Sequence, residues 1–87
     1  MAKHTFPLVI GANWTAISEG EATVLVQRRQ IYPVELFVAE AGTPPVSGDA
    51  GHTLAGDSGS ASFTDLNGLV VFARAQGGDS EISVTRY

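Results

Sequence analysis

The chain has 87 residues with five basic and nine acidic side chains, and its net charge of −4 argues against nucleic-acid binding, which needs a basic surface. It has no cysteine, which excludes disulfides and thiolate metal sites, and no run of about 20 apolar residues that would cross a membrane. A single domain of this size is marginally stable alone. Because only 16% of its residues are charged, against about 25% in a typical soluble domain, we expect permanent association with other subunits.

Residues 1–12 predict an extended N-terminal arm in front of a single β-domain at 13–87. Pro7 prevents a helix and cannot donate to a central ladder, so this segment is either an edge strand or an arm laid on a neighbouring subunit. Gly11 would act as a hinge, and Pro7 and Gly11 together end the apolar run too early for an export signal. We expect the arm to be buried against another chain through its apolar residues, which are Phe6, Leu8, Val9 and Ile10.

Four later stretches predict strong β-strands, because apolar and β-branched residues in them alternate or run between turn residues. They are residues 22–28, 31–39, 69–75 and 81–87. Arg29 and Gln30 lie between the first two and suggest a hairpin connection. Shorter strands are expected at 14–18 and 61–64, and no helix longer than about two turns is expected.

The spacing of the turn signals predicts an all-β fold, a small antiparallel β-sandwich or jelly-roll-like barrel of six to seven strands with an extended N-terminal arm. Much of the core should come from alternate positions of the four strong strands. The expected core residues are Val24, Val26, Leu36, Val38, Val70, Phe72, Ile82 and Val84.

Residues 40–59 form a long irregular segment in which Pro44 and Pro45 exclude both a helix and a central strand. A loop of this length in a small domain usually has a function or is ordered by a partner. We expect residues 42–59 to be catalytically inert and to serve geometry or contact.

Residues 56–59 of that segment, Gly-Asp-Ser-Gly, resemble the nucleophile segment of trypsin-like serine proteases, and His52 and Asp49 lie nearby. A catalytic triad needs serine and histidine to converge from separate rigid elements beside an oxyanion hole. Here they lie within one loop of a short chain. We therefore interpret Ser58 as part of a polar turn and assign no catalytic residue.

The pattern of histidines and acids predicts no metal site and no cofactor, although calcium between loops that carry Asp49, Asp57 or Asp65 stays open. Glu35 is the one carboxylate inside a strong strand. It is either a catalytic acid in an apolar setting or, as is commoner, a charge that protects a strand edge from mispairing.

Three aromatic residues invite two interpretations. Trp14, Tyr32 and Tyr87 could form a sugar-binding platform, but packing in the core or at a subunit interface is the commoner role. Arg28 and Arg29 are a basic pair that forms no patch, and they fit a solvated strand end better than a contact with an acidic partner.

The order of several segments resembles small structural proteins of tailed bacteriophages, which are short, cysteine-free and β-rich. The segments are residues 14–15, 22–27, 33–39, 68, 71–75 and 82–85. The resemblance covers about residues 14–87, rests on structural motifs and transfers no catalytic residue.

The resemblance implies a non-enzymatic virion protein, made in the host cytoplasm and placed on the capsid surface as a decoration or cement protein. Its expected partners are the major capsid protein and itself, as a homotrimer, with no nucleic acid and no membrane. Tail, head–tail connector or fibre-anchoring subunits are the alternative, and a carbohydrate-binding β-module is a further one. The expected contact residues outside the arm are Trp14, Arg28, Arg29, Pro44 and Pro45.

Overall fold

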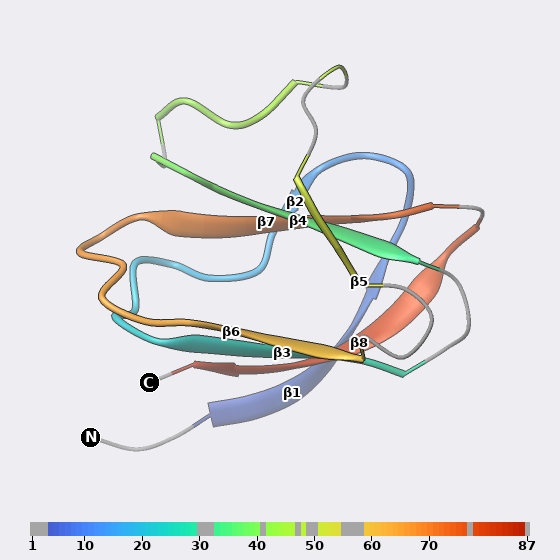
Figure 1. Cartoon of the computed structure of the whole chain (residues 1–87), viewed down its shortest axis with the longest axis horizontal. Helices are drawn as coiled ribbons and strands as arrows, with labels where there is room; N and C mark the ends of the chain where they lie inside the picture. The colour runs from blue at the N-terminus through green and yellow to red at the C-terminus, as the bar shows by residue number, and fades with distance from the viewer. Residues whose placement is uncertain are drawn as a thin grey trace.

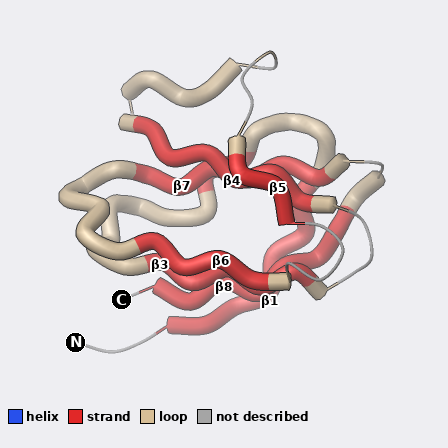
Figure 2. Tube along the Cα trace, viewed as in Figure 1, coloured by secondary structure: helices blue, strands red, loops and turns tan. Residues whose placement is uncertain are grey.

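A computed structural model of the chain describes residues 4–29, 33–40, 42–46, 48, 51–54, 59–76 and 78–86. These residues form eight strands in two antiparallel four-stranded sheets that pack as a sandwich (Figure 1). The tube in Figure 2 shows the two layers, and no helix occurs in the described part of the chain. Accordingly, none of these residues belongs to a helix long and apolar enough to span a membrane.

The two sheets contain non-consecutive strands. The first sheet runs in the order β1 (His4–Ile10), β8 (Ser80–Arg86), β3 (Val24–Arg28) and β6 (Ser60–Phe63). The second sheet runs in the order β2 (Thr15–Ala16), β7 (Val70–Ala75), β4 (Val34–Ala39) and β5 (His52–Leu54). The antiparallel sandwich is therefore confirmed, and so are the four strong strands within their described residues.

The strands pair by nesting, the first with the last and so on inward. β1 pairs with β8, β2 with β7, β3 with β6 and β4 with β5. The pairs β3–β8 and β4–β7 then join these four ribbons into two sheets. As a result the chain crosses from one sheet to the other at every connection except the one between β4 and β5.

Two expectations about topology are wrong, the strand number and the hairpin, and of the two architectures left open the sandwich is the one found. The sandwich has eight strands instead of six or seven, and its two sheets do not close into a barrel. The expected hairpin around Arg29 does not form, because β3 and β4 belong to different sheets. β3 pairs with β6 and β8, whereas β4 pairs with β7 and with β5, the next strand in the sequence.

Side chains of both sheets fill the space between them. The largest fully buried ones are Ile10, Leu36, Ile82, Val24, Val26, Val34, Val71 and Val84. The expected core holds except in β7, where the register sets Ala73 opposite Leu36 and Val71 opposite Val38. This register turns Val71 and Ala73 inward, so Val70 and Phe72 are buried on the outer face instead.

The N-terminal segment is a strand of the domain. Residues 4–10 pair with β8 along their whole length at the edge of the first sheet, where Pro7 is tolerated. Ile10 is only 2% exposed and belongs to the core. Of the two alternatives, the edge strand is correct for these residues, and an extended arm apart from the domain is not.

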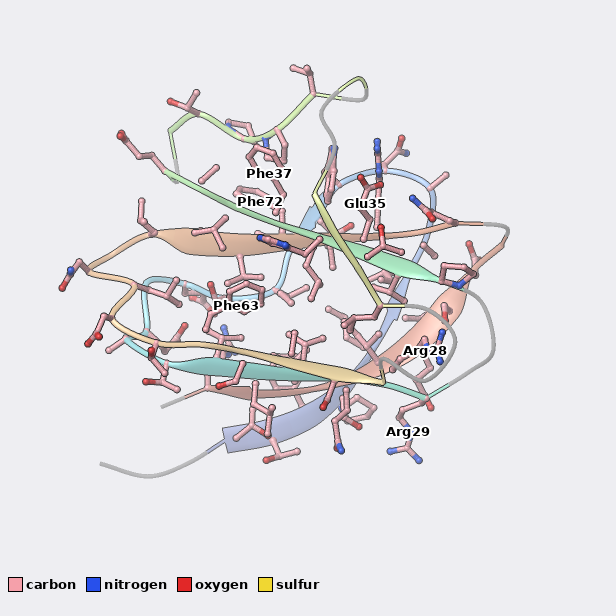
Figure 3. The ribbon with its side chains drawn as sticks, viewed as in Figure 1. Arg28, Arg29, Glu35, Phe37, Phe63 and Phe72 are labelled. Atoms are coloured by element: carbon pink, nitrogen blue, oxygen red, sulfur yellow. The ribbon has the colours of Figure 1, made fainter. Side chains whose placement is uncertain are left out.

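The segment after β4 covers the outer face of the second sheet. Figure 1 shows residues 42–46, in green, running over this sheet on the side away from the first sheet. Phe37 and Phe72, which are register partners on β4 and β7, point toward that segment in Figure 3. The proline-rich segment therefore packs on its own domain and gives the second sheet an outer layer.

Candidate functional site

Glu35 is the centre of a polar cluster on the outer face of the second sheet. Its side chain is 5% exposed, although β4 places it on the face opposite the main core. Oε1 accepts hydrogen bonds from Arg74 Nε at 2.8 Å and from Gln76 Nε2 at 2.9 Å. Oε2 accepts one from the backbone N–H of Gly51 at 2.7 Å. The carboxylate is thus buried together with a cation and two further donors.

These contacts determine the charge state of the carboxyl group. The hydrogen bond from Arg74 and the one from the Gly51 N–H lower the pKa of Glu35 below its usual range, against the opposing effect of burial. A catalytic acid needs a raised pKa, because it must carry its proton near neutral pH. Glu35 is therefore an ionised structural anchor and does not have the properties of a proton donor. It does not protect an edge either, since β4 lies inside its sheet.

Trp14 extends this cluster toward the covering segment. The Arg74 guanidinium carbon lies 4.2 Å from the centre of the Trp14 ring, and the Phe37 ring meets that ring edge-on at 5.8 Å. The indole Nε1 donates to the Val46 carbonyl at 2.9 Å. Arg74 thus connects the buried carboxylate with the indole, which in turn holds the covering segment at Val46.

A small hollow opens beside this stack. It has a volume of about 240 Å³ and is lined by Ala12, Asn13, Trp14, Pro45 and Arg74. Two of the expected contact residues, Trp14 and Pro45, are brought together here. Pro44 is exposed on the neighbouring covering segment.

The other expected contact residues lie elsewhere in the fold. Arg28 Nη1 donates to the Leu54 carbonyl at 3.3 Å, while Arg29 forms an ion pair with Glu81 at 3.4 Å and donates to Ser83 at 3.1 Å. Figure 3 shows both arginines at the end of β3, away from Glu35. Both arginines make contacts within the domain at a strand end, and whether they also meet a partner stays a prediction.

The four apolar residues of the expected arm separate by face. Phe6 and Leu8 are partly buried and Ile10 is buried on the inner face of β1, whereas Val9 is 62% exposed on the outer face. Only Val9 is therefore freely available to a partner as the chain stands.

The resemblance to a protease segment falls largely on residues outside the described ones. Asp49, Asp57 and Ser58 lie outside them, and His52 is exposed on the short edge strand β5. Tyr32 and Tyr87 also lie outside, so the aromatic platform can be assessed only at Trp14. The inert character of the 42–59 segment stays a prediction.

The calcium alternative rests on one described residue, Asp65, which is exposed. Within the described ranges no group of three or more histidines and carboxylates could hold a metal ion.

Comparison of the chain with protein families, curated proteins and solved structures finds no match.

Three members of the Glu35 cluster were not anticipated from the sequence. Arg74, Gln76 and Gly51 reach Glu35 only because β7 lies beside β4 in one register and the loop returns over the sheet. The one usable signal was an arginine within an otherwise apolar strand, which suggests a paired charge.

Proposed function

We propose that this chain is a non-enzymatic structural protein of a tailed-bacteriophage virion, a decoration or cement protein that binds the major capsid protein on the capsid surface. The observation that carries the proposal is the nested pairing of eight strands in two sheets. This is the order of a double-sheet jelly roll, an architecture that occurs in viral capsid domains as well as in lectins and cupins. The resemblance of the sequence to phage structural proteins favours a viral structural protein over a lectin or a cupin. The fold supports this choice by analogy.

The first sheet supplies a face that suits such a partner. Among the described residues no segment runs over its outer side, in contrast to the second sheet (Figure 1). Nine of the outward-facing residues carry no charge. They are Thr5, Pro7, Val9, Leu25, Gln27, Ser60, Ser62, Ser83 and Thr85. Glu81, the register partner of Val9, and Arg29, which forms an ion pair with it, bring charge to one end of this face. A surface whose central part has few charges is typical of a protein interface.

Purified virions of the phage that encodes the chain test this proposal. We expect the protein at a copy number that scales with the major capsid protein, and we expect purified protein to rebind capsids that lack it. A ring stoichiometry would place it in the tail or connector, and its absence from virions would overturn the proposal.

A pair of matched variants tests the docking face. Gln27→Lys places a charge in the middle of the uncovered face and should reduce capsid occupancy. Thr53→Lys makes the same kind of change at an exposed site on the edge of the second sheet and should leave occupancy unchanged.

A carbohydrate-binding module is the second candidate, because the hollow beside Trp14 combines an aromatic ring with the polar side chain of Asn13. The Trp14 ring is already stacked on Arg74 and its Nε1 is bonded to Val46, which leaves less of it for a sugar. Glycan-array binding that disappears in Asn13→Ala, a change that leaves this stack intact, would favour the second candidate.

A further inference from the structure

The four edge strands of the sandwich differ greatly in length. β2 has two residues, β5 has three and β6 has four, whereas β1 has seven. Short edge strands offer few unpaired backbone groups, and a long one is a template for another strand. Among the described residues no strand lies on the open side of β1.

β1 also lacks the charges that usually protect a long edge. Residues 4–10 include no lysine, arginine, aspartate or glutamate, although the chain as a whole has a net charge of −4. Pro7 is the one protective feature, because it offers no N–H to an added strand. Val9 stands 62% exposed on this strand and is one of two exposed large apolar residues in the described structure.

An apolar hollow opens between β1 and the residues that follow β2. It has a volume of about 380 Å³, and Phe6, Leu8, Ala16 and Ile17 supply its apolar lining. The ion pair of Arg86 Nη1 and Glu19 Oε1, 3.0 Å apart, lies at its polar side. A hollow with an apolar lining therefore lies beside the longest of the edge strands.

We propose that β1 pairs antiparallel with β1 of a second copy of this chain, which joins two first sheets into one continuous eight-stranded sheet. A strand placed across a two-fold axis from itself meets an identical edge, so one surface is enough to form a closed dimer. The pairing would set the two apolar hollows side by side and bring no like charges of β1 together.

A second copy fits this edge better than a ring of three copies does. A trimer needs two different surfaces that match each other, and the remaining edges are too short to match β1. Because Pro7 donates nothing, hydrogen bonding rests on the residues on either side of it, and we expect a reversible dimer.

Sedimentation equilibrium of the purified full chain, over micromolar to millimolar concentrations, tests the proposal. We expect a species of about 18 kDa, twice the 9.1 kDa of one chain. Val9→Lys should weaken dimerisation by about tenfold or more, since it brings two like charges to the shared edge. Val46→Lys is the control, because Val46 is 65% exposed on the segment that covers the other sheet.

Hydrogen exchange adds a readout that a change in folding would not imitate. The backbone amides of residues 4–10 should exchange more slowly in wild-type protein at high concentration than in Val9→Lys, with other strands unchanged. A monomer at all concentrations, a trimer, or a dimer weakened equally by both substitutions would overturn the proposal. None of these outcomes bears on the capsid proposal, which copy number in virions tests separately.

Discussion

Glu35 Oε1 and Arg74 Nε lie 2.8 Å apart across the neighbouring strands β4 and β7, at opposed positions of the register. The same carboxylate holds the N–H of Gly51, where the long covering segment returns to the sheet. One ion pair thus joins two central strands to the loop that covers them. Removing either partner would leave a buried charge without its counterion, and an unpaired buried charge strongly destabilises a fold.

Glu35→Gln should destabilise the fold by about 3 kcal/mol, because an amide cannot accept from Arg74, Gln76 and Gly51 together. Urea unfolding followed by tryptophan fluorescence at neutral pH measures the change. Glu40→Gln removes the same charge at an exposed position and should alter stability by less than about 0.5 kcal/mol. Equal effects of the two substitutions would show that the cluster is not an anchor.

Stability should fall in acid because of the same carboxylate. The pKa of Glu35 is lowered in the folded chain from its ordinary value of 4.5, so the unfolded state binds a proton first as the pH falls. The stabilisation that ionised Glu35 gives the fold is therefore fully present above the pKa of the unfolded chain, and it is lost as the pH drops through the lower pKa of the folded chain. Unfolding free energies measured from pH 6 to pH 3 should decrease less steeply in Glu35→Gln than in wild type. Parallel curves would contradict this assignment.

Gly51→Ala should destabilise the return of the covering segment by about 2 kcal/mol or more. A Cβ at this position would overlap the Leu36 carbonyl, a backbone group that cannot rotate away. Gly42→Ala is the control, since a Cβ there meets nothing within 4 Å. Thermal unfolding of the two variants makes the comparison, and a Gly51→Ala protein as stable as Gly42→Ala would rule out the close approach.

Ile10→Ala should cost about 2–5 kcal/mol, because Ile10 is 2% exposed and belongs to the core between the sheets. Val9→Ala changes the neighbouring residue, which is 62% exposed, and should change the free energy of unfolding of the monomer only slightly.

Deletion of residues 1–10 should unfold the domain, since it removes a whole edge strand. Circular dichroism of that deletion distinguishes this expectation from a dispensable arm.

Local patterns were enough to predict the fold class and most strands. The alternation around Val24 and Val26, and around Ile82 and Val84, is a property of neighbouring residues, and it correctly indicated which side chains enter the core. The β7 segment was different, because an almost continuous apolar run has no polar face to set its orientation. Its inward residues, Val71 and Ala73, follow from the register with β4.

The sequence by itself determined that the chain forms strands, because period-two alternation, turn residues and prolines act within a few residues of each other. Only the tertiary structure decided which strands pair, since each nested pair except β4–β5 joins segments separated by other strands. It also decided that residues 4–10 belong to the first sheet and that Glu35 is buried beside Arg74. These outcomes depend on hydrogen bonds and charges contributed from distant parts of the chain, which no local pattern encodes.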